Sequence, residues 1–147
     1  MILIKQLEKK LHNEIPLTKL MKLKIHKYND KELITTAPLS ININDKGTAF
    51  GGSLSTITII SSWCMCWLIS KELNMDNKNI VVIKNENSYL KPVSKDIICY
   101  TKKPSLEEIL IVKEKIQRKG SASIKIESKI IQDNQICVEF NGIYVIN

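Results

Sequence analysis

The chain has 147 residues, of which 44% are hydrophobic and 25% are charged, and these values fit one globular domain and argue against disorder. Its net charge of +7 suits an anionic partner such as nucleic acid, an anionic membrane surface or a phosphorylated small molecule. Nucleic-acid binding is not expected, because no basic run exceeds two residues and the aromatic residues, 5% of the chain, do not interleave with them as base stacking requires.

The first predicted element is an amphipathic helix over residues 2–13. Ile4, Leu7 and Leu11 recur at helical spacing, with lysine and glutamate between them, which is the pattern of a helix with one apolar face. Pro16 ends this helix or begins the next turn.

Residues 22–37 are predicted to form a β-hairpin. Two strand-like runs, 23–26 and 32–36, flank the pair Asn29-Asp30. Such a polar pair between two strand-like runs is a turn signal.

A long buried helix is predicted over residues 54–69. No charged side chain occurs from Gly47 to Ser70. A membrane span needs about 20 predominantly apolar residues, whereas this run has sixteen, five of them serine or threonine. A helix that is apolar all round in a soluble chain is a buried one, so we expect the rest of the chain to wrap it, and we expect no insertion into a membrane.

Strands are predicted to follow this helix. The segment 108–117 alternates, with Ile109 and Ile111 opposed to Leu110 and Val112, and alternation is typical of a strand. The expected strands cover residues 80–90, 97–101, 108–117, 121–131 and 136–146. The elements together predict an α+β fold, in which an antiparallel sheet wraps around the one central helix.

The cysteines do not predict a metal site. Cys64 and Cys66 lie in the apolar stretch and are interpreted as small buried residues, while Cys99 and Cys137 stand apart from them. No CxxC pair occurs and both histidines are distant in sequence, so zinc is not expected. The N-terminus has charges every few residues and lacks the apolar region of a signal peptide, which indicates a reducing, cytoplasmic location.

The segment 44–53 is where the sequence predicts chemistry. Gly51 and Gly52 lack a Cβ and allow close backbone approach, and a helix start offers unpaired N–H groups and the positive end of the helix dipole. The backbone N–H groups of Gly51, Gly52 and Ser53 are therefore candidate catalytic donors to the negative charge that builds on a carbonyl oxygen during acyl transfer. The alternative is that the two glycines only permit a tight entry into a buried helix.

A family resemblance begins in the same segment. The run Asn44-x-x-Gly47-Thr48-x-Phe50-Gly51-Gly52-Ser53 before an apolar helix resembles the hotdog-fold thioesterases. It is most similar to the thioesterase family found as the C-terminal half of some bacterial acetyltransferase-fused proteins, and no acetyltransferase half is present in this chain. Three further matches follow in order: Glu14-Ile15-Pro16-Leu17 with Met21, Tyr89-Leu90-Lys91-Pro92-Val93 with Asp96, and Lys119-Gly120-Ser121-Ala122-Ser123-Ile124.

The resemblance implies a hotdog fold with its site at the start of the central helix. Asn44 matches a family position near the attacking water or the thioester, with a turn or cap role as the alternative. Phe50 stands where many of these enzymes have histidine, and its ring either walls the acyl pocket or belongs to the core. Lys91, Arg118 and Lys119 flank the matching segments and are candidates for contacts with coenzyme A phosphates or an acidic carrier protein, or are solvated surface cations.

Four further residues complete the candidate substrate site. Ser55, Thr58 and Ser62 share one face of the central helix, where they orient a water molecule or bond back to helix carbonyls as structural groups. A hydroxyl at its ordinary pKa is a poor base. Tyr89, in the Tyr-x-x-Pro-Val match, is the remaining candidate for substrate contact.

One departure from the family concerns the general base. Many hotdog thioesterases carry Asp or Glu on the central helix about two turns past the glycines, a position that here falls close to Ile59. No carboxylate occurs between Asp45 and Glu72, and Asp45 and Glu86 are the nearest alternatives in sequence. A hotdog dehydratase is not expected either. The resemblance implies that such an enzyme uses a histidine in the loop before this helix together with an acid on the helix.

The sequence therefore predicts a single hotdog domain over residues 1–147 that hydrolyses an acyl thioester on coenzyme A or an acyl carrier protein, without a metal or cofactor. Asn44 and the helix N-terminus are expected to act on the carbonyl and the water. The resemblance implies a homodimer or a dimer of dimers with the site at the interface. The alternative function is a non-catalytic module that binds acyl-CoA or an acyl carrier, which the missing helix carboxylate favours.

Overall fold

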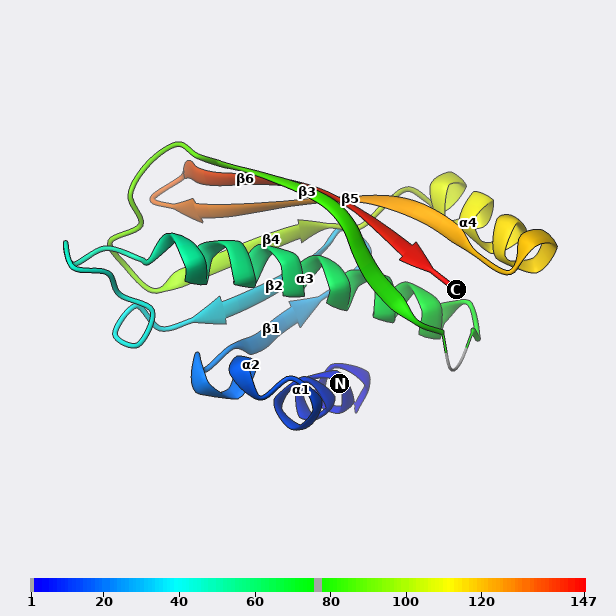
Figure 1. Cartoon of the computed structure of the whole chain (residues 1–147), viewed down its shortest axis with the longest axis horizontal. Coiled ribbons are helices and arrows are strands. Elements are labelled where there is room, and N and C mark those ends of the chain that lie inside the picture. The colour runs from blue at the N-terminus through cyan, green and yellow to red at the C-terminus, as the bar shows by residue number, and fades with distance from the viewer. Residues whose placement is uncertain (1, 76–77) are drawn as a thin grey trace.

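The computed structural model describes residues 2–75 and 78–147. A six-stranded sheet curves around one long helix, and two N-terminal helices and a fourth helix lie at its periphery (Figure 1). The elements are α1 (Ile2–Glu14), α2 (Pro16–Leu20), β1 (Lys24–Tyr28), β2 (Glu32–Ala37), α3 (Gly51–Glu72), β3 (Ile80–Tyr89), β4 (Ile97–Lys102), α4 (Leu106–Lys119), β5 (Ala122–Gln132) and β6 (Gln135–Ile146).

All neighbouring strands are antiparallel, in the order β1-β2-β4-β5-β6-β3. The predicted α+β class is therefore confirmed. The predicted hairpin consists of β1 and β2, and its turn is organised by Asn29, whose Oδ1 accepts the backbone N–H groups of Lys31 and Glu32. Strand β3 comes directly after the central helix in sequence but lies at the edge of the sheet, where it pairs with β6.

One predicted strand is wrong: residues 108–117 belong to helix α4 (Leu106–Lys119). The Ser105 side chain accepts the N–H of Glu108, and the Glu108 side chain accepts the N–H of Ser105, which together form a capping box. Gly120 closes the helix in the left-handed conformation, with φ of 83°. The buried residues of this helix follow a helical period and are Ile109, Val112 and Ile116.

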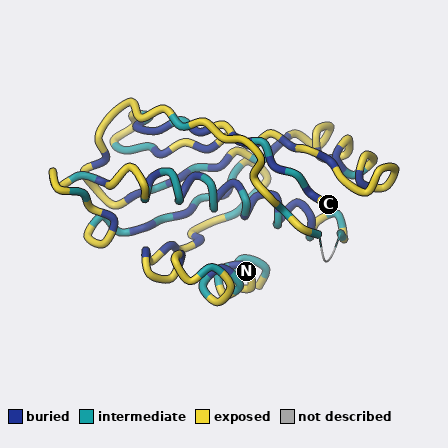
Figure 2. Tube along the Cα trace, in the orientation of Figure 1, coloured by how far each residue is buried: buried dark blue, intermediate teal, exposed yellow. Residues whose placement is uncertain are grey.

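The central helix α3 (Gly51–Glu72) is longer than predicted and is largely enclosed (Figure 2). It is long and apolar enough to cross a membrane, yet 56% of its apolar window is buried inside the protein, the pattern of a core helix. The Tyr144 hydroxyl of β6 donates to the Ile59 carbonyl at 2.6 Å. This bond fixes the middle of the helix against the sheet.

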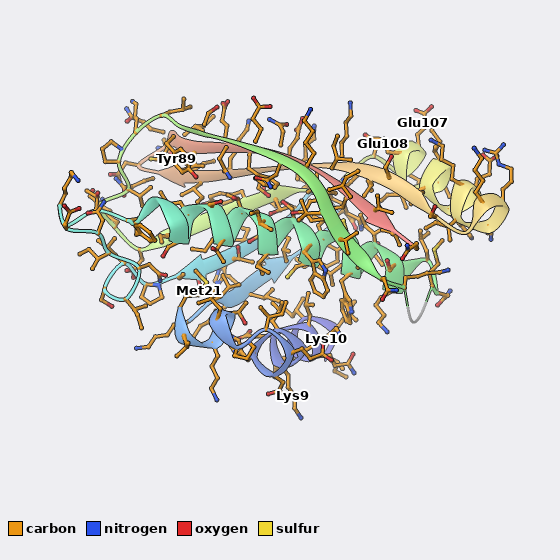
Figure 3. All side chains as sticks on the ribbon, in the orientation of Figure 1. Lys9, Lys10, Met21, Tyr89, Glu107 and Glu108 are labelled. Atoms are coloured by element: carbon orange, nitrogen blue, oxygen red, sulfur yellow. The ribbon has the colours of Figure 1, made fainter. Side chains whose placement is uncertain are left out.

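The N-terminal helices pack beside β1 and α3. Leu7 and Leu11 of α1 are buried, as the helical spacing predicts, and the His12 Nε2 lies 2.8 Å from the Leu23 carbonyl. Pro16 begins α2 (Pro16–Leu20), where its missing N–H costs nothing in a first turn. Helix α2 ends at Leu20, and its C-cap residue Met21 lies close to the start of α3 (Figure 3).

Candidate active site

Helix α3 begins with backbone N–H groups that no side chain caps. Phe50, the N-cap residue, donates its own N–H to the Asn42 carbonyl at 2.7 Å, and the first helical bond runs from the Leu54 N–H to the Phe50 carbonyl. In the described part of the chain, the N–H groups of Gly51, Gly52 and Ser53 have no acceptor. These three donors lie at the positive end of the helix dipole.

An apolar hollow of about 360 Å³ opens beside these donors. Its walls come from α2, from the loop before α3 and from the first turns of α3, and Figure 3 shows Met21 near this end of the helix. Several of its apolar side chains are about half exposed, which leaves room for an apolar ligand. The lining residues are Leu17, Leu20, Met21, Ile41, Asn42, Phe50, Gly52, Ser53 and Thr56.

The two glycines have different steric surroundings. A Cβ on Gly52 would lie 2.3 Å from Phe50 Cε2, whereas a Cβ on Gly51 would meet nothing within 4 Å. The Phe50 ring therefore folds over the first turn at Gly52 and forms part of the wall of the hollow. Close approach requires glycine at position 52 only.

Asn44 serves the loop before α3. Its Oδ1 accepts the backbone N–H groups of Lys46 and Thr48, and its Nδ2 donates to the Thr48 Oγ1 at 2.9 Å. Asn44 does not line the hollow. These contacts fit the alternative that the sequence analysis gave for Asn44, a turn residue. Asn44 shapes the loop that carries Phe50.

Asn42 lines the hollow, and the sequence did not single it out. Only 3% of its surface is exposed. Its Nδ2 donates to the Met21 carbonyl at 3.0 Å and to the Pro38 carbonyl at 2.8 Å, and its own carbonyl accepts the Phe50 N–H. Asn42 thus joins the end of α2 to the start of α3. No local pattern in the sequence marks Asn42 as a residue of the site.

The three hydroxyl residues of α3 that the sequence analysis proposed for the substrate site, Ser55, Thr58 and Ser62, do not line the hollow. The Ser62 Oγ is 2.7 Å from the Ser128 Oγ in the core, and the Thr58 Oγ1 donates to the Ser55 carbonyl and to the Asn87 Oδ1 of β3. Thr58 and Ser62 are completely buried. These contacts are structural, and they leave the predicted orientation of a water molecule by Thr58 or Ser62 without support.

No ionisable side chain lines the hollow in the described residues. Asp45 is exposed and pairs with Lys46 at 3.2 Å. Glu86 stands opposite Asn141, which in turn stands opposite Glu127, and directly paired residues point to the same face of a sheet. Glu127 is exposed while its neighbour Ser128 is buried against α3, so Glu86 lies on the face away from the helix.

The remaining candidates divide between the two ends of the molecule. Tyr89 lies at the end of β3 near the start of α3 (Figure 3), and Lys91 donates from Nζ to the Gln135 Oε1 at 2.8 Å. The segment that follows Lys91 is bonded to the loop before α3, because the Val93 carbonyl accepts the Ala49 N–H. Arg118 and Lys119 occupy the last turn of α4, at the opposite end of the chain from the start of α3 (Figure 1). Within one chain they do not reach the hollow.

The described residues contain no group of three or more His, Cys, Asp or Glu side chains that could hold a metal ion. The arrangement at α3 is instead suited to polarising a carbonyl oxygen with backbone N–H groups.

Comparison with known proteins agrees with the fold. A protein of unknown function from Chlorobaculum tepidum TLS is 35% identical, with a TM-score of 0.94 over 98% of this chain and 93% of that chain. The putative thioesterase from Shewanella oneidensis is 32% identical, with a TM-score of 0.88 over 97% of this chain and 96% of that one.

A more distant solved structure shares the fold alone. A thioesterase from Haemophilus influenzae is 14% identical, with a TM-score of 0.69 over 98% of this chain and 90% of that chain. The predicted hotdog fold is confirmed, and the family and the Shewanella oneidensis neighbour support a thioesterase-type function. The sequence model of the family described as "Putative thioesterase (yiiD_Cterm)" matches residues 4–147, and the chain therefore belongs to this thioesterase family.

Proposed function

We propose that the protein hydrolyses acyl thioesters, with the carbonyl oxygen held by the N–H groups of Gly52 and Ser53. The observation that carries this proposal is that these N–H groups are unpaired and that both residues line the apolar hollow. Negative charge develops on the carbonyl oxygen as water attacks, and preorganised donors stabilise it at the moment when it forms. The C–S bond then breaks, and the products are a carboxylate and a thiol.

The hollow is the proposed place of the acyl chain. Its side chains are apolar and include Leu17, Leu20 and Phe50, which suits an alkyl or aryl group and disfavours a charged one. The thiol carrier is proposed to be coenzyme A or an acyl carrier protein. Either is anionic and suits a chain with a net charge of +7.

We propose that the site positions the attacking water and that no side chain of the same subunit deprotonates it. The described lining of the hollow offers no ionisable group, so the proton of the attacking water passes to solvent. No metal or cofactor takes part in this scheme. Because the described lining holds no ionisable group, we expect the rate to show no inflection at the pKa of a carboxylate or of a histidine.

The assembly is proposed to be a homodimer or a dimer of dimers in the cytoplasm. Strand β3 pairs on one side only, and the edge it exposes carries Val81, Val82 and Ile83. An exposed apolar edge of this kind favours pairing with a second chain. Neither nucleic acid nor membrane insertion belongs to the proposal.

A panel of acyl-CoA and acyl carrier protein substrates with free-thiol detection tests the reaction. The sharpest variant is Ser53→Pro, which deletes one proposed donor N–H at a first-turn position where proline is tolerated. Ser53→Ala is the matched control, because it removes the hydroxyl and keeps the N–H. We expect Ser53→Pro to lose about 100- to 1000-fold in kcat and Ser53→Ala to stay close to the parent protein.

Two outcomes contradict the proposal. Saturable binding of acyl-CoA with no thiol release above background supports the alternative, a non-catalytic acyl-carrier binding module. Equal activity in Ser53→Pro and Ser53→Ala, with both variants folded, removes the Ser53 N–H from the mechanism.

A further inference from the structure

The segment from α2 to β1 carries more than half of the net positive charge of the protein. Four lysines and no acidic residue lie between Glu14 and Asp30, in a chain whose net charge is +7. All four lysines are exposed, while the apolar residues Met21, Leu23 and Ile25 that alternate with them are buried. These α2–β1 lysines are Lys19, Lys22, Lys24 and Lys27.

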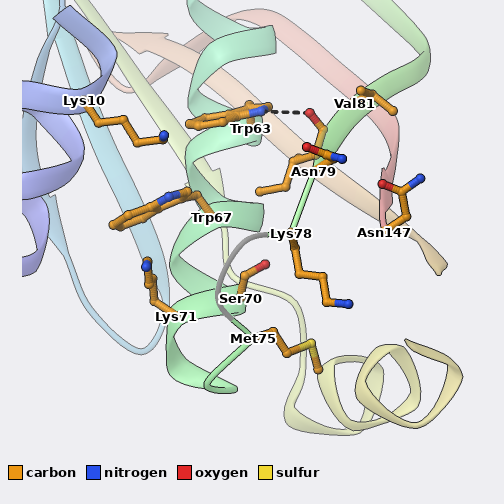
Figure 4. A pocket seen from close by; sticks show the side chains of 11 residues that line it. Lys10, Trp63, Trp67, Ser70, Lys71, Met75, Lys78, Asn79, Val81 and Asn147 are labelled. Atoms are coloured by element: carbon orange, nitrogen blue, oxygen red, sulfur yellow. Dashed lines mark hydrogen bonds between the residues drawn. The ribbon is translucent and has the colours of Figure 1, made fainter. Parts of the chain in front are cut away.

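The α2–β1 lysines differ from the cations around a second hollow, of about 530 Å³, which lies toward the end of α3 (Figure 4). There the Lys10 ammonium pairs with Glu14, and the Lys71 ammonium lies 5.2 Å from the centroid of the Trp67 ring. The α2–β1 lysines have no ion pair, side-chain hydrogen bond or ring contact within the described residues. Glu8 of α1, which accepts a backbone N–H of β1 at 3.4 Å, is not paired with them either. Their charge is therefore available to an anionic partner.

The α2–β1 lysines begin at the rim of the hollow beside the start of α3. Lys19 and Lys22 flank Leu20 and Met21, which line that hollow. From Lys22 the chain runs into β1, which is an edge strand of the sheet (Figure 1). At the rise of a strand, Lys27 lies up to about 16 Å from Lys22. The cations thus form a strip that leads from the site along the edge of the sheet.

The rim of the hollow is apolar and open. Leu17, Leu20 and Phe50 line it, and each of them is more than half exposed. Large apolar side chains that are this exposed and are bordered by charged ones mark contact surfaces for proteins. Coenzyme A covers little beyond the hollow and gathers its phosphates at one end, whereas a protein carrier can span both the rim and the strip of cations.

We propose that the apolar rim and the α2–β1 lysines together dock an acidic acyl carrier protein. This inference rests on the proposed thioesterase function and selects between the two carriers named there. The acidic face of the carrier lies along the lysines, and its apolar side chains cover Leu17 and Leu20. The thioester arm then enters the hollow beside the N–H groups of Gly52 and Ser53.

Binding of the carrier tests this docking surface without turnover. The full-length protein is titrated against a fluorescently labelled holo acyl carrier protein that bears no acyl group, and anisotropy is measured over a range of salt concentrations. We expect saturable binding that weakens as the salt concentration rises, because the contacts join exposed charges. Coenzyme A and vesicles of anionic phospholipid are titrated separately, as two other anionic partners.

Charge-reversal variants assign the binding to the α2–β1 lysines. Lys19→Glu combined with Lys24→Glu should weaken carrier binding about tenfold or more. It should also raise KM for acyl carrier protein substrates and leave acyl-CoA hydrolysis unchanged. Lys115→Glu combined with Lys125→Glu, at exposed positions of α4 and β5, is the matched control, because it changes the net charge by the same amount. Circular dichroism checks that both double variants are folded.

Several results overturn the docking proposal. These are an absence of saturable carrier binding, an equal loss of binding in the two double variants, and a loss of coenzyme A affinity as large as the loss for the carrier. Binding of the vesicles but not of the carrier through the same lysines also overturns it. Failure of docking leaves acyl-CoA hydrolysis intact, and failure of all hydrolysis leaves the anisotropy result unaffected, so the two proposals fail separately.

Discussion

Gly51 and Gly52 are neighbours in sequence, but only Gly52 is constrained by its surroundings. In Gly52→Ala, the new Cβ would lie 2.3 Å from Phe50 Cε2, so the Phe50 ring must swing away. The ring is 55% exposed and has space to move, so we expect a stability change below about 1 kcal/mol. Because the ring walls the proposed acyl hollow, KM should rise for medium and long acyl chains.

Gly51→Ala is the control for that variant. Its Cβ meets nothing within 4 Å, and replacing glycine by alanine in a helix favours folding by about 0.5–1 kcal/mol. We expect an unchanged KM and an equal or higher melting temperature. Thermal denaturation and steady-state kinetics on both variants check this, and a KM effect equal at the two positions would contradict the assigned role of Phe50.

The four cysteines are buried, and their chemistry follows from that burial. Desolvation raises the pKa of Cys99 to about 11 and also raises the pKa of Cys64 and Cys66. A thiol reacts as the thiolate, so a raised pKa lowers the reactive fraction at mildly alkaline pH. We expect the native protein to be inert to a disulfide reagent such as DTNB, and the denatured protein to react.

The same pKa shifts have a consequence for stability. The folded pKa values lie above the ordinary thiol value of 9.0, so the unfolded chain releases these protons first as the pH rises. The free energy of unfolding should therefore stay constant below the ordinary thiol pKa. It should fall as the pH rises from that value through the folded pKa values. Denaturant midpoints measured at pH values below and above the ordinary thiol pKa test this trend. Fast labelling of the cysteines in the native protein would contradict their burial.

At the scale of elements, hydroxyl groups join α3 to the sheet inside the core. The Ser128 Oγ of β5 lies 2.7 Å from both the Ser62 Oγ of α3 and the Thr101 Oγ1 of β4. A second pair, the Thr35 Oγ1 and the Ser61 Oγ at 2.6 Å, joins α3 to β2. Because buried polar groups are costly when unpaired, these contacts fix the rotation of the helix relative to the sheet.

Ser128→Ala removes the shared partner and leaves two buried hydroxyls without it. We expect a cost of about 1–3 kcal/mol. Ser62→Ala is the matched variant, and it should cost less because Ser128 keeps its bond to Thr101. Urea unfolding measures both. A large fall in kcat for Ser62→Ala with unchanged stability would instead support the predicted orientation of a water molecule by Ser62.

Helix α4 shows why an alternating segment was predicted as a strand. The prediction placed Ile109 and Ile111 on one face and Leu110 and Val112 on the other, but Ile111 and Leu110 are exposed, while Ile109, Val112 and Ile116 are buried. These buried residues are three and four positions apart, which is the spacing of one face of a helix. The deciding signals were local, since Ser105 with Glu108 and the terminal Gly120 are helix boundaries.

At the scale of the whole molecule, strand β3 is an unprotected edge. It is almost entirely exposed (Figure 2), with Val81 50% and Ile83 60% exposed. We expect light scattering to give a dimer or tetramer at micromolar concentration. Ile83→Lys should shift the protein toward monomer, because an inserted charge blocks strand pairing.

Leu110→Lys on α4 is the control for the edge variant. Leu110 is 49% exposed and apolar but lies outside the sheet, so its replacement should leave the assembly unchanged. A parent protein that is monomeric throughout, or an equal effect of the two lysine substitutions, would contradict the proposed assembly through β3.

The sequence alone determined the central helix, the glycines at its start and every strand found in the structure, to within one or two residues at most ends. These features follow from local signals: an uncharged apolar run, adjacent glycines and period-two alternation. The family motif likewise predicted the hotdog fold. None of these signals depends on which segments meet in space.

The tertiary structure decided which side chains face the site. Asn44 turns into its own loop while Asn42 lines the hollow, and strand register places Glu86 on the far face of the sheet. Arg118 and Lys119 lie at the end opposite the start of α3 (Figure 1). A one-residue difference in strand register moves a side chain to the other face of the sheet. Hollows form only where distant segments pack together. The sequence alone therefore predicts neither the face of a strand residue nor the lining of a hollow.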